Sequence, residues 1–233
     1  MVIPTYNERE NLPELVRRIE ELGMGLHVLV VDDNSPDGTG ELADELAAAR
    51  PWLQVTHRPA KRGLGTAYIE GFRRALGQDY EVIGEMDADL SHNPAHLPAM
   101  FQALETADLV LGSRYVPGGG VRNWGLMRQL ISRGGCLYAR LLLGVHVRDL
   151  TSGFKLFRRR LLEKLDLDTV RSNGYAFQIE LTYRAIRGGF QVVEVPIIFD
   201  DRRVGKSKLS RQVVLEAVLM VPRMRLRGSS HHT

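Results

Sequence analysis

The chain has 233 residues, of which 44% are hydrophobic and 25% are charged, as in an ordinary globular protein. This length allows one large α/β domain or two small ones. The single cysteine, Cys136, excludes an intramolecular disulfide, and no stretch has the roughly 18–20 consecutive apolar residues that span a bilayer. The N-terminus lacks a basic region followed by an apolar core, so we expect no secretory signal.

Strand-like apolar runs alternate with helical periodicity in the first half of the chain. A leucine-rich segment with the spacing of one helix face follows the first run, and similar segments follow the next three. This alternation predicts an α/β fold with a mainly parallel central sheet flanked by helices on both faces. The predicted strands are Val2–Pro4, His27–Val31, Leu53–Thr56, Glu81–Met86 and Leu109–Leu111.

Polar clusters follow four of these runs. In open α/β sheets, ligands bind outside the carboxyl ends of the parallel strands. We therefore expect the four clusters to lie along one edge of the sheet and to form a site. They are Pro4-Thr5-Tyr6-Asn7-Glu8, Asp32-Asp33-Asn34-Ser35, Asp87-Ala88-Asp89 and Gly112-Ser113-Arg114.

The third cluster has two carboxylates one residue apart, Asp87 and Asp89, at the tip of a predicted buried strand. Oxygen ligands of this kind suit Mg²⁺ or Mn²⁺, which often binds through one or two carboxylates and substrate phosphates. An EF-hand loop is excluded, because His92 stands where it needs glycine and Pro98 where it needs glutamate. The pair alone is a weak signal, since acids also cap helices. Together with the other three strand ends it favours a metal site.

Several other chemistries lack their signatures. The chain has no Gly-x-Ser-x-Gly, no Gly-x-x-x-x-Gly-Lys and no Gly-x-Gly-x-x-Gly after the first strand. His92 and His96 have a metal-ligand spacing, but we interpret them as polar residues at the start of a helix. We interpret His27 as structural and Cys136 as a packing residue.

Positive charge is concentrated in the second half of the chain. The net charge is only +3, but the pI is about 9.1. This asymmetry indicates an anionic partner, either a nucleic acid, a membrane surface or a phosphorylated substrate, although a solvated basic surface explains any single cluster. The basic residues include Arg114, Arg122, Arg128, Arg133, Arg140, Arg148, Lys155, Arg202, Arg203, Lys206, Lys208, Arg211, Arg223, Arg225 and Arg227.

The chain contains eight motifs in this order: PTYNERENL, VVDDNSPDGT, GLGTAYIEGF, MDADLSHNP, GSRYVPGGG, DLTSGFKLFRR, GYAFQIEL and DRRVGKSKL. Together these motifs resemble the polyprenol-phosphate (dolichol-phosphate) mannose synthases of glycosyltransferase family 2. They occur in the family's order from Ile3 to about Val221, and the chain resembles the short form without C-terminal membrane spans. The resemblance implies a single GT-A (Rossmann-like) domain over residues 1–227, with a nucleotide-sugar half (1–112) and an acceptor and membrane-facing half (113–227). We expect residues 228–233 to be a disordered tail or a cloning remnant.

The resemblance also implies roles for individual residues. Asp89 would bind the metal with Asp87 near it, and Ser91 stands where many relatives have a metal-binding Gln. Asp87 and Ala88 would lie along the ribose and diphosphate. The nucleoside would contact Pro4, Tyr6, Glu8, Val31 and Asp33. Phosphates at the donor–acceptor junction would be bound by Arg114, Arg128, Arg202 and Lys208.

The implied reaction transfers mannose from GDP-mannose to a polyprenyl phosphate with inversion, giving the β-mannosyl phosphate and requiring Mg²⁺ or Mn²⁺. A phosphate nucleophile is already anionic, which agrees with the lack of an obvious catalytic histidine. A glucosyltransferase that uses UDP-glucose remains the nearest alternative. The chain lacks the N-terminal glycine-rich signature of a sugar-1-phosphate nucleotidyltransferase, which argues against that class of enzyme. A nucleic-acid-binding module leaves the strand-end acids unexplained, so we expect no nucleic-acid partner.

The acceptor implies a peripheral protein on the cytoplasmic side of a membrane. Two stretches combine apolar residues with arginines and suit an anionic membrane interface, Leu126–Leu143 and Val213–Val221 with the arginines after it. Packing of both on the sheet is the alternative. A membrane-embedded partner subunit or a fused domain is a third way of anchoring the chain.

Overall fold

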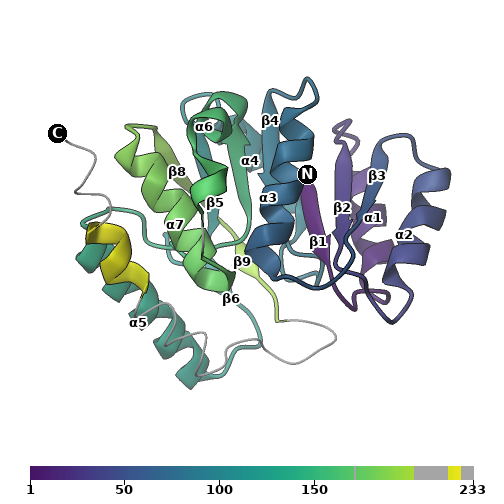
Figure 1. Cartoon of the computed structure of the whole chain (residues 1–233). Helices are drawn as coiled ribbons and strands as arrows, with labels where there is room; N and C mark the ends of the chain where they lie inside the picture. Colours follow the sequence, from purple (N-terminus) through teal and green to yellow (C-terminus); the bar gives the residue numbers. More distant parts are fainter. Residues whose placement is uncertain (171, 202–219, 227–233) are drawn as a thin grey trace.

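The computed structural model describes residues 1–170, 172–201 and 220–226. A seven-stranded sheet in the order β3-β2-β1-β4-β7-β5-β8 runs through the centre of the molecule (Figure 1). Strands from both predicted halves of the chain therefore share one sheet. Their bounds are β1 (Val2–Thr5), β2 (Val28–Asp32), β3 (Leu53–His57), β4 (Val82–Glu85), β5 (Leu109–Ser113), β7 (Lys155–Arg158) and β8 (Val192–Pro196).

Six of these strands are parallel, and β7 alone in the sheet is antiparallel to its neighbours. The predicted α/β fold with a mainly parallel sheet is confirmed. All five residues of β2 are buried, as expected for a strand covered on both faces. The carboxyl ends of β1, β2, β4 and β5 lie at the same edge of the sheet, so the predicted polar clusters share that edge.

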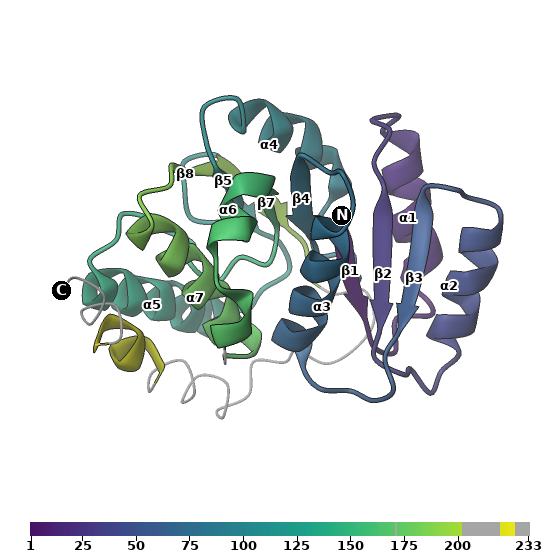
Figure 2. The same ribbon diagram turned by 45° about the horizontal axis from the view of Figure 1, so that its top comes forward.

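Helices cover both faces of the sheet (Figures 1 and 2). Alternate side chains of β1 point to opposite faces, so Val2 and Ile3 belong to different hydrophobic cores. The core around Val2 includes residues of α3, α5, α6 and α7, and the core around Ile3 includes residues of α1, α2 and α4. The helix bounds are α1 (Leu12–Glu21), α2 (Thr39–Ala48), α3 (Leu64–Leu76), α4 (Leu97–Ala103), α5 (Leu126–Leu143), α6 (Arg159–Lys164) and α7 (Gly174–Arg187), with single 3₁₀ turns η1 (Pro94–His96) and η2 (Leu167–Thr169).

A second, two-stranded sheet lies close to the carboxyl end of β5, where the amide of Ile197 donates to the carbonyl of Ser113. It pairs β6 (Gly120–Val121) with β9 (Ile198–Phe199) in parallel. Residues 220–226 are helical, and Arg225 donates a hydrogen bond to the carbonyl of Leu142 near the end of α5. The predicted Val213–Val221 stretch lies mostly outside the described residues.

None of the helices within the described ranges is both long enough and apolar enough to cross a bilayer.

Two helical glycines differ in the space around them, and this gives a test of the packing of α3 on the sheet. A Cβ at Gly71 in α3 would overlap Cγ1 of Val2, whereas a Cβ at Gly134 in α5 would meet nothing within 4 Å. We expect Gly71→Ala to destabilise the protein by about 1–3 kcal/mol relative to Gly134→Ala, because overpacking opposes the gain in helix propensity only at Gly71.

Urea unfolding of the two variants measures this difference directly. Gly134→Ala, the matched control, should be neutral or stabilising by up to about 1 kcal/mol. Equal stabilities would show that β1 moves to accept the methyl group.

Candidate active site

The carboxyl ends of β1 and β2 are linked by side-chain hydrogen bonds. Thr5 donates to Asp32 Oδ1 over 2.8 Å, and the Ser35 amide donates to Asp32 Oδ2 over 2.9 Å. In the parallel register Pro4 stands opposite Val31. These bonds hold the first two predicted clusters together, so Pro4, Val31 and Asp33 lie at one corner of the sheet edge.

Asp33 is buried and forms an ion pair with Arg58, which follows β3. The same guanidinium contacts Glu70 over 2.9 Å and donates to Thr66 Oγ1 over 2.8 Å. Burial raises the pKa of Asp33, and Arg58 opposes that shift. Arg58 was missed from the sequence, because a single arginine after a strand matches no motif.

Tyr6 and Glu8 are half-buried beside this corner. The Lys61 ammonium lies 3.6 Å from the centroid of the Tyr6 ring, a cation–π contact. Glu8 accepts a hydrogen bond from Asn11 over 2.8 Å, and its amide donates to Thr39 Oγ1 over 3.0 Å. Aromatic, cationic and carboxylate groups thus border the space at the ends of β1 and β2.

The acidic tip follows β4 directly. The Tyr68 hydroxyl donates to Asp87 Oδ1 over 3.0 Å, and burial with the nearby Asp87 charge raises the pKa of Tyr68, so this hydroxyl keeps its proton. Asp89 is buried, and its Oδ1 accepts from the amide of Ser91 over 3.1 Å and also from the Ser91 hydroxyl. Ser91 therefore orients the carboxylate of Asp89.

His92 lies inside the site rather than at the start of a helix. Its Nδ1 accepts a hydrogen bond from the Asp87 amide over 3.3 Å, and its ring stacks on Phe154 at 5.2 Å between centroids. Burial lowers the pKa of His92, which keeps the ring neutral and able to accept. The prediction for His92 was wrong, because the sequence did not show that the chain after Asp89 turns back and brings the buried His92 ring to the amide of Asp87. His96 does lie at a helix start, in η1.

The donor set of the tip suits a hard divalent cation. Asp87 and Asp89 provide carboxylate oxygens and Ser91 a hydroxyl oxygen, which are the ligands that Mg²⁺ and Mn²⁺ prefer. Within the described ranges, no three His, Cys, Asp or Glu side chains form a complete metal cage. A cation at this tip would therefore need further ligands from phosphates or water.

Arg114, at the end of β5, is buried against Asp149. Two of its guanidinium nitrogens donate to the Asp149 carboxylate over 2.7 and 2.6 Å, and its amide donates over 2.9 Å. Burial acts to raise the pKa of Asp149, but Arg114 outweighs it and the net shift is downward. The pair consequently stabilises the fold above the unfolded-state pKa of about 4 and loses that contribution as the pH falls through the folded value.

Glu194 of β8 holds the segment that carries Asp149. Its carboxylate accepts from the Ser113 hydroxyl over 2.7 Å and from the amides of Arg148 and Asp149 over 2.9 Å each. Cys136 is buried beside Asp149, and burial raises the pKa of its thiol to about 11, which agrees with a packing role. Neither Asp149 nor Glu194 was singled out from the sequence.

Arg128 lies in the first turn of α5 and reaches the same region. It donates to Asp201 over 2.7 Å, and its Cζ is 3.9 Å from the centroid of the Trp124 ring. Phe199 contacts Trp124 on one side and His92 on the other, with ring centroids 5.4 and 5.1 Å apart. The structure therefore joins the acidic tip to the basic cluster through aromatic rings. Two residues predicted to bind phosphate, Arg202 and Lys208, lie outside the described residues.

A buried ion pair lies at the end of β4, directly before the acidic tip. Lys155 of β7 contacts Glu85 of β4 over 2.9 Å and also donates to the side chain of Gln178 in α7. Burial lowers the pKa of Lys155 and raises that of Glu85, while each charge opposes the shift of the other. Glu85 and Lys155 are directly opposite in the antiparallel register, so the pair joins β7 to the strand that carries the tip.

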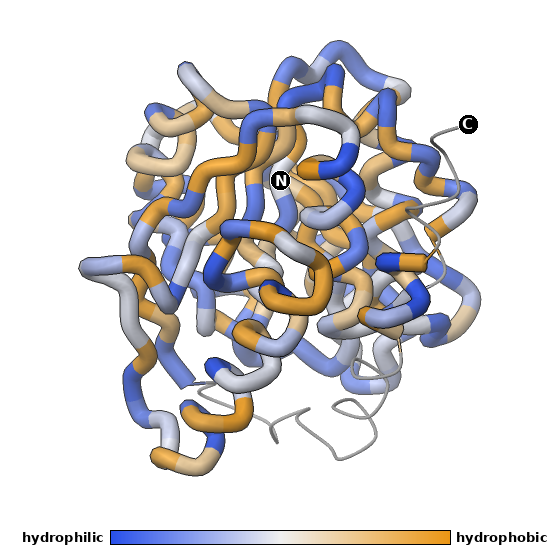
Figure 3. Tube along the Cα trace, turned by 90° about the vertical axis from the view of Figure 1, so that its left-hand side faces the viewer, coloured by the Kyte–Doolittle hydropathy of each residue, from blue (hydrophilic) through white to orange (hydrophobic). Residues whose placement is uncertain are grey.

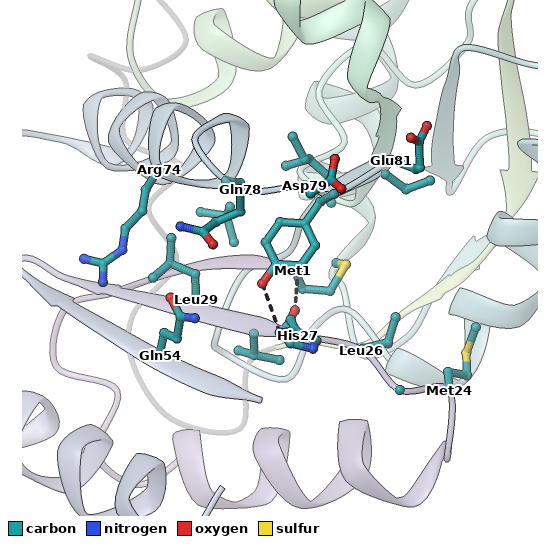
Figure 4. A pocket seen from close by; sticks show the side chains of 18 of the residues that line it. Met1, Met24, Leu26, His27, Leu29, Gln54, Arg74, Gln78, Asp79 and Glu81 are labelled. Atoms are coloured by element: carbon teal, nitrogen blue, oxygen red, sulfur yellow. Dashed lines mark hydrogen bonds between the residues drawn. The ribbon is translucent and has the colours of Figure 1, made fainter. Parts of the chain in front are cut away.

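A cavity of about 320 Å³ lies away from this site, beside the starts of β1 and β2 (Figure 4). His27 is one of its lining residues, and the Tyr80 hydroxyl hydrogen-bonds to His27 Nδ1 over 2.9 Å. The predicted structural role of His27 agrees with this contact. The cavity holds none of the strand-end clusters.

The outer face of α5 is apolar. Leu126, Leu130 and Leu141 are 80%, 66% and 68% exposed, and a helical spacing puts them on one stripe with Leu137. Figure 3 views this side of the molecule, where hydrophobic and hydrophilic stretches alternate along the trace. Apart from Leu226, every exposed large apolar residue in the described part of the chain belongs to α5: Leu126, Met127, Leu130, Ile131, Leu137, Tyr138 and Leu141.

Residues 1–166 match the glycosyl transferase family 2, and the chain belongs to this family. It is 53% identical to the polyprenol monophosphomannose synthase of Mycolicibacterium smegmatis over 98% of this chain and 87% of that protein. It is 50% identical to the undecaprenyl-phosphate mannosyltransferase of Micrococcus luteus over 95% of this chain and 91% of that protein. The resemblance in the motifs is thereby confirmed.

A solved structure with a similar fold is the glucosyl-3-phosphoglycerate synthase of Mycobacterium tuberculosis. Its complex with Mn²⁺, UDP-glucose and phosphoglyceric acid has a TM-score of 0.67 and 21% identity, over 97% of this chain and 78% of that one. At this identity the likeness concerns the fold, and it confirms the predicted GT-A architecture.

The buried pair of Arg114 and Asp149 gives a stability test. Asp149→Asn leaves the Arg114 charge buried without its counterion, so we expect a loss of about 3–5 kcal/mol in the free energy of unfolding. The control is Glu163→Gln, which breaks an exposed pair with Arg159 and should change stability by less than about 1 kcal/mol. Chemical denaturation at pH 7 measures both, and a small loss for Asp149→Asn would mean that water reaches the guanidinium.

Proposed function

We propose that this protein transfers mannose from GDP-mannose to a polyprenyl phosphate, giving polyprenyl phosphate β-mannose with inversion. The observation that carries the proposal is the acidic tip after β4 together with the arginines after β5, of which Arg114 is buried and Arg128 is half-buried. A donor diphosphate bound through a cation and an anionic acceptor both find partners there. The relatives named polyprenol monophosphomannose synthase and undecaprenyl-phosphate mannosyltransferase support the acceptor and the sugar.

The nucleoside of the donor lies at the ends of β1 and β2 in this proposal. Pro4, Val31 and Tyr6 border it, and Asp33 is the carboxylate available to the base. Arg58 holds Asp33 in place through the buried ion pair. Ala88, buried between the two acids, lies along the ribose and diphosphate.

Asp87 and Asp89 hold a divalent cation with the donor diphosphate, and Ser91 supports Asp89. The cation supplies Lewis-acid stabilisation of the departing nucleoside diphosphate. The structural neighbour from M. tuberculosis has been crystallised with Mn²⁺ and UDP-glucose and with Mg²⁺ and UDP, which supports a divalent metal in this fold.

The acceptor needs no strong base, because its phosphate is anionic at neutral pH. The task of the protein is to bring two anions together, and arginine suits this through bidentate phosphate contacts. Asp149 takes two donors of Arg114, so its role is to position that guanidinium. Arg128, Arg202 and Lys208 complete the phosphate-binding set in this proposal.

The deciding experiment measures transfer of radiolabelled mannose from GDP-mannose to a polyprenyl phosphate in detergent, with labelled UDP-glucose in parallel. We expect mannosyl lipid that depends on Mg²⁺ or Mn²⁺ and little transfer from UDP-glucose. Efficient transfer of glucose alone would instead favour the glucosyltransferase, the second candidate.

The metal assignment predicts a large effect at Asp89. Asp89→Ala should lower cation-dependent GDP-mannose binding at least about 100-fold, because even the supporting residues of metal sites contribute about 10- to 100-fold. Ser91→Ala, the matched control at the same tip, should cost less, because water replaces a hydroxyl ligand. Calorimetric titration with and without EDTA measures both. Normal cation dependence in Asp89→Ala would refute the assignment.

Peripheral membrane contact follows from the lipid acceptor and from the exposed apolar stripe of α5. Arg133 and Arg140 lie on the same helix, so an anionic surface attracts the face that the apolar residues enter. The second predicted stretch contributes Arg223 and Arg225, both exposed in the described helix after residue 219. We propose α5 as the principal contact and the cytoplasmic leaflet as its location, with a partner subunit or fused domain as an additional anchor.

The contact predicts which variants leave the membrane. Leu130→Gln combined with Leu141→Gln should weaken binding to anionic vesicles by about tenfold per leucine, because each loses apolar burial without a change in charge. Changing Arg223, Arg225 and Arg227 to Gln should have a smaller, salt-dependent effect. Vesicle flotation measures both. Full flotation of the leucine variant with loss in the arginine variant would assign the contact to the C-terminal stretch.

A further inference from the structure

Two buried N–H donors lie together without an acceptor in the described part of the chain. They are Nε1 of Trp124 and Nε of Arg128. Trp124 is 8% exposed, and Arg128 Cζ lies 3.9 Å from the centroid of its ring, so the two donors belong to one cluster. A buried donor without a partner is costly, and such groups normally meet an acceptor in the protein, in water or in a ligand.

The acidic groups near this cluster are already bound to other donors. Asp201 accepts a hydrogen bond from Nη1 of Arg128, but the Nε–H of Arg128 has no acceptor among the described residues. Asp149 accepts hydrogen bonds from Arg114. The Arg114 guanidinium is 5.6 Å from the Trp124 ring centroid, and that of Arg133 is 5.6 Å from the ring of Tyr115. Among the described residues, the charged groups packed here are Arg114 with Asp149, Arg128 with Asp201, Arg122 with Asp200 at 4.0 Å, and Arg133.

Trp124 also lies between the two parts of the proposed reaction. On one side, Phe199 connects it to His92 and so to the amide of Asp87. On the other side, Gly125 and the exposed Leu126 follow it directly at the start of the apolar stripe. Its backbone is held by Gln129, whose side chain donates to the Trp124 carbonyl over 3.0 Å. A ligand that reaches both sides has an anionic head and an apolar tail.

We infer that Trp124 binds the acceptor, its indole N–H and the Nε–H of Arg128 each donating to an oxygen of an isoprenyl phosphate. The inference rests on the proposed function and adds a residue that the family motifs do not assign. The apolar tail then leaves along the stripe of α5 that begins at Leu126. Arg128 keeps its contact with the Trp124 ring, so the tryptophan both orients the guanidinium and supplies a donor of its own.

Trp124→Phe tests the indole N–H separately from the aromatic ring. The variant keeps an aromatic face for Arg128 and loses one hydrogen bond to a charged oxygen, so KM for farnesyl phosphate should rise about tenfold or more. The affinity for GDP-mannose should stay the same. Tyr115→Phe is the matched control, because it too deletes one donor from the cluster, a hydroxyl that is already bound to Ser132 over 2.6 Å. Its KM for farnesyl phosphate should not change.

Intrinsic fluorescence gives a readout that does not require turnover. The chain has two tryptophans, so Trp52→Phe leaves Trp124 as the sole tryptophan, whose emission is then followed. We expect farnesyl phosphate to change its emission saturably, inorganic phosphate to do so with weaker affinity, and farnesol and anionic vesicles without isoprenyl phosphate to have little effect. A response to vesicles alone that equals the response to farnesyl phosphate would overturn the inference in favour of a general lipid surface.

The inference and the proposed function fail in different ways. If the wild-type protein transfers mannose to farnesyl phosphate but Trp124→Phe keeps its KM and binding, the inference is wrong and the function stands. If binding of farnesyl phosphate changes Trp124 emission but no sugar is transferred from GDP-mannose, the acceptor site stands and the proposed reaction is wrong.

Discussion

The pairing of β7 between β4 and β5 is the constraint on which the site depends. These two strands carry the acidic tip and Arg114 at their carboxyl ends, and β7 holds them one strand apart. The register is secured by Lys155 opposite Glu85, a fully buried pair that cannot slip without separating its charges in the interior. A glycosyltransferase needs its donor and acceptor side by side, and this spacing places the acidic tip and Arg114 near each other at one edge of the sheet.

The carboxylates of the site differ in the groups that contact them. Asp149 and Glu85 each contact a buried arginine or lysine, so these two carboxylates serve structure and positioning. Arg58 holds Asp33 in the same way, at the corner assigned to the nucleoside in the proposed function. Asp87 and Asp89 accept hydrogen bonds from the hydroxyl groups of Tyr68 and Ser91. A hydroxyl donor orients a carboxylate without removing its charge, so Tyr68 and Ser91 hold the two carboxylates of the tip in place.

In the proposed function, the second half of the chain connects this chemistry to a lipid surface. Helix α5 buries Cys136, Ala139 and Leu143 but exposes four other leucines, so much of its apolar surface faces away from the core. The exposed stripe begins next to Trp124, at the aromatic end of the site. An acceptor with a phosphate head and an isoprenoid tail fits this order of surfaces, since its head and tail meet polar donors and apolar side chains in turn.

The sequence by itself determined the family, the alternation of strands and helices, and the edge of the sheet where the polar clusters meet. These follow from local patterns, because apolar periodicity and the polar residues after each strand need no knowledge of distant contacts. Only the tertiary structure decided the partners of those residues. Asp149 is 35 residues from Arg114, and Arg58 is 25 from Asp33, so no local signal joins them. The exposure of the apolar face of α5 could not be predicted from the sequence either, because periodicity defines an apolar face without showing whether protein or solvent covers it.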